Sequence, residues 1–282
     1  MTHEIILAFL CVFGAVLHWQ LSLALHTFFL HRYHTHGQFS MSVYWQRFFY
    51  ILTFLLQGPA FLKPETYRKL HLAHHEFSDT EYDPHSPSNY LTSSTKHKFW
   101  KPLFAMMLDT KKIFEEIQAN KHWISGRYGK KIAIDWKGFE TVSNSKEATL
   151  LMGALYILLW CLVIPYWILL VFLPIILLNG PLQGAIVNWF GHVKGTRNFD
   201  IPDNSKNTPG APLMNGELYQ NNHHQFPESP NLGCGPGEFD PIYHLMIRPL
   251  LMLRIIHLSQ KAKDELNAIK TWQANLPKSP SA

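Results

Sequence analysis

The apolar residues of this chain are gathered into blocks that polar stretches separate. Residues 5–30 contain no Asp, Glu, Lys or Arg. They are long enough to cross a bilayer as one helix, which needs about 20 residues. Residues 148–193 form a second block without these charges, and its length predicts two further spans, at about 148–170 and 172–193. Proline interrupts a helix, so the turn is expected at Pro165 or in the region 174–181. The alternative is a buried helix pair of a soluble protein, but such a long apolar run argues against it.

A third apolar stretch, residues 43–62, is long enough to span a membrane but is interrupted by Arg47, Gln57 and Pro59. Histidine clusters lie on both sides of it in the sequence. If those clusters share one site, the stretch must begin and end on the same membrane face. We therefore interpret it as an interfacial or re-entrant helix, which leaves three true spans.

The basic residues predict the orientation of these spans, because Lys and Arg favour the cytoplasmic side. Residues 1–4 have none, whereas many lie between the first span and the second block: Arg68, Lys69, Lys96, Lys98, Lys111, Lys112, Lys130 and Lys131. The N-terminus is thus expected outside, and the loop, the C-terminal part and all histidine clusters on the cytoplasmic side. Residues 96–137 are expected to be partly helical, facing either headgroups and an anionic substrate or solvent. The tail 267–282 is expected to be flexible.

Composition adds few further limits. The 282 residues are 16% charged and 14% aromatic, and the mean hydropathy of −0.06 conceals the separate blocks. The net charge of +5 would suit nucleic acid, anionic headgroups or an acidic substrate. Three widely separated cysteines without a CxxC pair argue against a disulfide framework. The first residues, "MTHE", lack the basic region of a cleavable signal peptide.

The most informative feature is the histidines, of which there are 17. Four short segments hold most of those of interest: His31-Arg-Tyr-His-Thr-His36, His71-Leu-Ala-His74-His75, Asn188-Trp-Phe-Gly-His192 and Gln220-Asn-Asn-His223-His224. Positions i, i+3 and i+4 of a helix share one face. The second and fourth segments can therefore each direct three side chains to one point, and Asn188 and His192 also share a face.

The first segment has a different spacing. His31 and His36 are five residues apart, which places them about 140° apart on a regular helix. They can converge only if the helix ends or bulges there.

Imidazole-rich sites suit iron, copper, zinc or nickel. A zinc site usually has four ligands, so eight histidines in these segments indicate two metal ions: His31, His36, His71, His74, His75, His192, His223 and His224. His34 and His85 also lie in or near the segments.

With these motifs the sequence resembles the membrane fatty acid desaturases of the stearoyl-CoA desaturase type. That family carries an HxxxxH box, two HxxHH boxes and an Asn-x-x-x-His pair at the end of its last span. The flanking stretches "HHEFSDTEYDPHSP" (74–87), "GELYQNNHHQFP" (216–227) and "FDPIYHLM" (239–246) are similar too. The resemblance extends from about residue 12 to 255. His34 and His85 match no ligand position of the family pattern.

Two departures from the family pattern stand out. The chain lacks the family's usual first span, as in a short form of bacterial type. Its third box opens with Gln220 where the family has histidine. An amide oxygen coordinates more weakly than imidazole, so Gln220 is expected to bind weakly or to hold a water on the metal, the second role being slightly favoured. Asn188 is a similar candidate.

The resemblance implies an all-α integral membrane protein, with one desaturase domain over residues 1–282 and a cytoplasmic helical cap that carries the boxes. It implies two non-haem iron ions that use O2 to introduce a cis double bond, at the Δ9 position, into an acyl chain on CoA or lipid. O2 is reduced to water. Glu217, Asp79 and Asp83 are candidates to accept the second ring N–H of a metal-bound histidine. The chain has no haem or flavin motif, so electrons are expected from a separate ferredoxin or cytochrome. Nucleic acid is not an expected partner.

Two other functions remain open. A fatty acyl hydroxylase can share the same boxes, and no motif reports how the reaction is partitioned. A histidine-rich metal transporter would hold its metal near the bilayer midplane, whereas these clusters fall at one edge.

Overall fold

The computed structural model describes residues 2–92, 100–129, 136–163 and 166–277, which are mainly helical. The longer elements are α1 (Thr2–Leu25), α2 (Val43–Gln57), α3 (Pro64–Phe77), α4 (Trp100–Gln118), α5 (Lys137–Ser143), α6 (Lys146–Val163), α7 (Tyr166–Leu177), α8 (Asn179–Val193), α9 (Gln220–Gln225), α10 (Arg248–Met252) and α11 (Gln260–Ala274). Short turns of 3₁₀-helix and two π-helical segments join them: η1 (His26–His36), η2 (Gly58–Ala60), η3 (Pro87–Asn89), η4 (Trp123–Gly126), η5 (Ala211–Met214) and η6 (Tyr243–Ile247).

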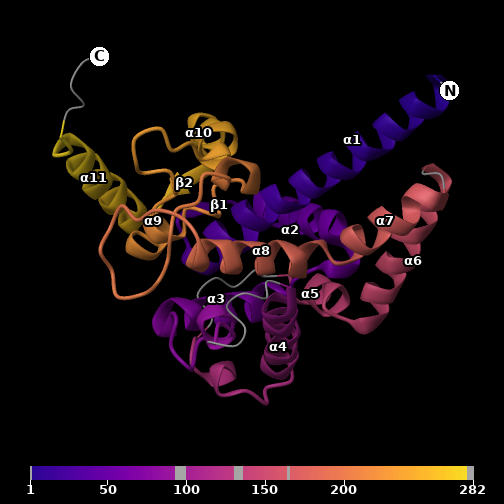
Figure 1. Ribbon diagram of the computed structural model, residues 1–282, viewed down its shortest axis with the longest axis horizontal. Helices are drawn as coiled ribbons and strands as arrows, with labels where there is room; N and C mark the ends of the chain where they lie inside the picture. Colours follow the sequence, from indigo (N-terminus) through magenta and orange to yellow (C-terminus); the bar gives the residue numbers. More distant parts are fainter. Residues whose placement is uncertain (1, 93–99, 130–135, 164–165, 278–282) are drawn as a thin grey trace.

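Helix α1 and the π-helical segment η1 form one continuous apolar helix, Ile5–His36, that is long enough to cross a membrane. Only 17% of its most apolar window is buried, whereas the core helix of a soluble protein would be mostly buried. The side chains of Ile5, Phe9 and Phe13 are more than half exposed. Figure 1 shows α1 extending away from the rest of the molecule, with α6 and α7 on the same side. Its surface is therefore suited to lipid.

The second apolar block is divided inside the region 174–181, one of the two places where a turn was expected, and not between residues 170 and 172 as the expected spans would have it. Helix α7 runs through the expected boundary at residues 170–172 and contains Pro174, and the break before α8 falls at Leu178. Pro181 lies in the first turn of α8, where a missing N–H costs no helical hydrogen bond. Pro165 lies outside the described residues. Among the described helices, one passes the length and composition test for a span, or two if the bent pair α5–α6 counts as one.

Helix α2 packs along α1 and returns the chain through η2 to α3. Pro64 stands at the first position of α3, where its fixed φ suits a helix start. The histidines that flank α2 then meet, because the Nε2 atoms of His36 and His71 are 3.0 Å apart. The segments that precede and follow α2 therefore meet at one site.

Two features that involve the C-terminal part were not predicted from the sequence. Strands β1 (Phe39–Met41) and β2 (Ile256–Leu258) pair antiparallel, with Ser40 opposite His257. The tail from residue 267 was expected to be flexible. It is instead helical up to Ala274, where α11 ends. Ile269 is buried, and Trp272 packs against Phe199. These apolar contacts hold the helix; residues 278–282 lie outside the described part.

Candidate metal centre

The segment η1 brings the two histidines of the first box together. It is a π-helix, in which one extra residue per turn shifts the side-chain positions. Its residues are all buried, and the rings of His31 and His36 lie with centroids 5.0 Å apart. Gly37 ends the segment with φ of 64°, a left-handed conformation that glycine adopts without strain. The bulge that the five-residue spacing requires is therefore present.

Five imidazoles converge in a first cluster. Helix α3 contributes His71 and His75, and α9 contributes His223, to the pair from η1. The Nε2 atom of His223 lies 2.9 Å from those of His31 and His75. The Nε2 atom of His71 lies 2.9 Å from that of His75 and 3.0 Å from that of His36. Nitrogen atoms this crowded repel one another unless protons or a shared cation lie between them.

A second cluster holds His74, His192 and His224, with one nitrogen atom of each within 4.8 Å of the others. They come from α3, α8 and α9, three elements far apart in the sequence. His74 and His75 are neighbours on α3 but belong to different clusters. Helix α3 therefore contributes side chains to both clusters.

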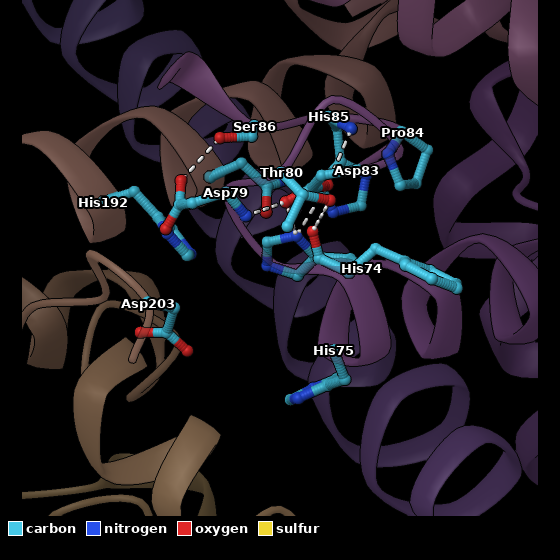
Figure 2. Close-up of polar contacts among 12 residues, drawn as sticks. His74, His75, Asp79, Thr80, Asp83, Pro84, His85, Ser86, His192 and Asp203 are labelled. Atoms are coloured by element: carbon cyan, nitrogen blue, oxygen red, sulfur yellow. Dashed lines mark hydrogen bonds and ion pairs between the residues drawn. The ribbon is translucent and has the colours of Figure 1, made fainter. Parts of the chain in front are cut away.

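Each histidine of the second cluster is held by its own carboxylate. The Nδ1 atom of His74 donates to Asp83 at 2.9 Å, that of His192 to Asp79 at 2.9 Å, and that of His224 to Asp203 at 2.7 Å. Figure 2 shows these acidic residues around His74 and His192. With Nδ1 protonated, the Nε2 atom carries the lone pair.

The Nε2 atoms of His74, His192 and His224 are buried and have no hydrogen-bond partner among the described residues. An unpaired buried polar atom costs about 1–3 kcal/mol. Three such atoms in one cluster are therefore suited to hold a ligand.

The first cluster has a similar anchor. Glu217 accepts a hydrogen bond from Nδ1 of His31 at 2.9 Å. Burial alone would raise the pKa of Glu217, but its interaction with His31 holds it below its ordinary value. Glu217, Asp79 and Asp83 thus all contact a histidine of a predicted ligand set.

Burial favours neutral imidazoles at this centre. It lowers the pKa of His71, His74, His75 and His223 well below the ordinary histidine value, and the neighbouring histidines lower it further. Only the neutral ring offers a lone pair to a metal ion. The site is thus prepared for a cation rather than for an anion.

Buried polar contacts fix the elements that carry these ligands. Arg32, next to His31, forms an ion pair with Asp240 at 2.9 Å, with neither side chain exposed. In the short helix α9, the Nδ2 atom of Asn222 donates to Glu238 and to the Leu232 carbonyl at 2.6 and 2.7 Å. A side chain at Gly191 would collide with Gln220, so the glycine allows α8 and α9 to approach.

The two predicted amide ligands lie beside the clusters but do not join them by any contact that the structure records. The Nε2 atom of Gln220 donates to the Glu217 carbonyl at 2.6 Å. The Nδ2 atom of Asn188 donates to the Gly184 carbonyl at 2.8 Å. Both residues line a cavity of about 700 Å³ that also borders His71, His85 and Glu217.

Sequence reasoning missed two residues of this centre. Asp203 lies in the loop after α8, 21 residues before its partner His224, and no spacing rule connects the two. His85 was set aside, yet it is buried with its ring centroid 4.4 Å from that of His74. Its place in "DPH", close behind the second box, was the available signal.

Comparison with known proteins decides the family. The profile of the fatty acid desaturase family matches residues 5–232. This chain belongs to that family. It is 28% identical over 250 residues to Delta-9 desaturase-like 5 protein of Arabidopsis thaliana, covering 83% of this chain and 71% of that one.

Two further relatives have names that describe other activities. Hex-5-enoyl-[acyl-carrier protein] acetylenase of Moorena producens is 27% identical over 252 residues, 81% of this chain and 70% of that one. Acyl-CoA 5-desaturase AL21 of Anemone leveillei is 28% identical over 228 residues, 77% and 61% of the two chains. The family implies an oxidoreductase that acts on acyl chains, and the buried histidine clusters could bind metal.

Proposed function

We propose that this protein is an O2-dependent fatty acyl desaturase that forms a cis double bond, at Δ9, with two histidine-bound iron ions. One observation carries the proposal: neighbouring residues of α3, His74 and His75, enter two separate histidine clusters. Two metal sites that both take ligands from α3 suit a reaction in which two hydrogen atoms leave one substrate.

The spacing of the first cluster favours a metal with more than four ligands. With metal–nitrogen bonds of about 2.1 Å, ligands at right angles lie about 3.0 Å apart, and tetrahedral ligands about 3.4 Å apart. Four of the nitrogen pairs are 2.9–3.0 Å apart. Five imidazoles also exceed the usual zinc set of four. Iron accepts such a shell.

The chain's own residues would hold and orient the metals. His31, His36, His71, His75 and His223 would bind one ion, and His74, His192 and His224 the other. Together with O2, the two ions would supply the oxidising power to remove hydrogen from unactivated methylene groups. Glu217, Asp79, Asp83 and Asp203 would fix the ring orientations and add negative charge around a neutral first shell.

The cavity beside the clusters supports an apolar substrate. Its lining includes Leu23, Pro59, Phe61, Met106 and Ala185 as well as His71, and its volume lies within the range of ligand pockets. Such walls would hold methylene groups beside the metals and keep water away. Chain length and bond position would follow from how deeply the acyl chain enters.

The cavity lining also suggests where an anionic carrier group would bind. It includes Lys63, Lys111 and Lys146. Burial and the charge of Lys146 lower the pKa of Lys63, so these two cations lie near each other. A phosphate-bearing carrier would relieve this repulsion. Because the relatives include proteins named for CoA and for acyl carrier protein, both carriers belong in the test.

We place the metal centre on the cytoplasmic side, with the N-terminus outside, on the distribution of Lys and Arg. Cys161 is exposed, so the test needs a Cys161→Ser background. A cysteine introduced at Lys121 should react with a membrane-impermeant reagent only after cells are opened. Reaction in intact cells would contradict the orientation.

The activity test is lipid analysis of a host that expresses the chain together with a ferredoxin or a cytochrome electron donor. Gas chromatography–mass spectrometry should detect a new monounsaturated fatty acid that is absent with the His223→Ala variant. Hydroxylated acyl chains alone would favour the hydroxylase instead. No new product with either donor, from protein that carries two iron ions, would contradict the proposal.

A further inference from the structure

The second cluster has fewer imidazoles than the first. It holds three histidines where the first holds five, and the third box supplies Gln220 in the position where its family has histidine. The amide nitrogen of Gln220 is engaged with the Glu217 carbonyl. An amide oxygen is a weaker ligand than imidazole for the metals that such a site binds.

His85 lies beside this cluster with an unused ring. Its side chain is 4% exposed, and neither ring nitrogen has a hydrogen-bond partner among the described residues. Candidate ligand atoms of His74, Asp83 and His85 all lie within 4.8 Å of one another, in a group that shares His74 with the second cluster. His85 also lines the same cavity as Gln220 and Asn188.

The backbone, rather than the ring, holds His85 in place. Its amide N–H donates to Asp83 at 3.1 Å, and Pro84 stiffens the link between the two residues. Asp83 also orients His74, so one carboxylate sets the positions of both imidazoles. Figure 2 shows His85 and Pro84 following Asp83 beside the ring of His74. The ring of His85 is left available for another group.

We propose that His85 supplies the fourth imidazole of the second metal site and takes over the part of the histidine that Gln220 replaces. This inference rests on the proposed function, because it requires a metal at the second cluster. The competing explanation is that His85 is a packing residue whose nitrogens contact buried water. A second substitution distinguishes the metal-ligand role of His85 from the packing role. In a variant that lacks His85, a new imidazole at position 220 would restore a metal ligand but not a packing contact at position 85.

The experiment compares the purified parent with His85→Ala, His85→Gln, Gln220→His and the double variant His85→Ala/Gln220→His. Iron per chain is measured by elemental analysis, and Co²⁺ binding to the metal-free proteins is followed by its visible absorption. The parent and Gln220→His should bind close to two iron ions. His85→Ala should bind close to one and take up its second Co²⁺ at least about tenfold more weakly. The double variant should return to two.

His34→Ala is the matched control, since His34 is also buried, lies near a box and faces Glu65 rather than a cluster. It should keep two iron ions. Size-exclusion chromatography in detergent establishes that each variant is folded, and His85→Gln provides a variant of similar volume if His85→Ala is not.

Each outcome bears on one proposal. A parent with two iron ions and a His85→Ala variant that keeps both would overturn the role of His85 alone. Iron loss that Gln220→His does not restore, in folded protein, would also overturn it. A parent without iron would contradict the proposed function instead.

Discussion

The two histidine clusters share helix α3 but are built in different ways. In the first, five imidazole nitrogens crowd one another at 2.9–3.4 Å, with Glu217 behind His31. In the second, three imidazoles each have a carboxylate of their own, from Asp83, Asp79 and Asp203. The first cluster has ligands in surplus, whereas the second relies on orientation and charge from outside.

This difference indicates how each cluster should respond to damage. A cluster with many ligands tolerates the loss of a supporting carboxylate, because the remaining rings still define the site. A cluster with few ligands depends on the group that fixes each ring, since partners of metal-bound histidines commonly contribute 10- to 100-fold in affinity or activity. The following tests compare the two, from the largest expected effect to the smallest.

His223→Ala should have the largest effect, because His223 contacts three other imidazoles of the first cluster. Iron per chain should fall to one or less, and lipid desaturation should fall by more than about 100-fold. Elemental analysis and product yield, both normalised to protein, measure the two effects. His257→Ala, at an exposed position on β2, is the control. Full activity in the His223 variant would refute the assignment of the first cluster.

Asp203→Asn should weaken the second site by about 10- to 100-fold in metal affinity. The amide removes the charge and no longer fixes the Nδ1 proton of His224. Co²⁺ titration of the metal-free protein should show one site unchanged and one weakened. Asp264→Asn, on the exposed face of α11, should change neither. Two unchanged sites in the Asp203 variant would show that this carboxylate does not support a ligand.

Glu217→Gln should have a smaller effect, of less than about tenfold on metal affinity, because four other imidazoles remain beside His31. The same Co²⁺ titration measures it. A loss equal to or larger than that of Asp203→Asn would reverse the comparison, since the crowded cluster would then depend on its carboxylate as much as the other one.

Gln220→Ala should have the smallest effect on iron content, because the histidines still hold the metals. It should reduce product yield more than iron, if the amide holds a water or binds weakly. Gln220→His should keep iron and some activity. A Gln220→Ala variant equal to the parent in both measurements would mean that this side chain only fills space.

The sequence predicts the candidate metal ligands better than it predicts the carboxylates that hydrogen-bond them and the way the ligands divide between the clusters. The i, i+3, i+4 spacing places His71, His74 and His75 on one side of α3 whatever the rest of the chain does. It does not show that His74 and His75 enter different clusters, because this depends on where α8 and α9 pack. Asp203 could not be found for the same reason: its contact with His224 is made by a loop whose path is set by tertiary packing.

The fold shows the same limit. Charge-free blocks identified the long N-terminal helix and the helices of the second block, since hydrophobicity is a local property. The order of α11 to Ala274 depends on contacts with distant residues, such as that of Trp272 with Phe199. Composition near the C-terminus therefore indicated a frayed tail where packing makes a helix.

The π-helical segment η1 has a consequence for the rotation of the whole N-terminal helix. Its π-helical hydrogen bonding sets the rotational phase between α1 and the first box, and the hydroxyl of Thr35 bonds the Leu30 carbonyl five residues back. Deleting one residue there would turn α1 by about 100° relative to His36. Apolar side chains such as Phe9 and Phe13 would then face a different direction. The π-helical segment thus couples the outward face of α1 to the direction in which the first box presents its imidazoles.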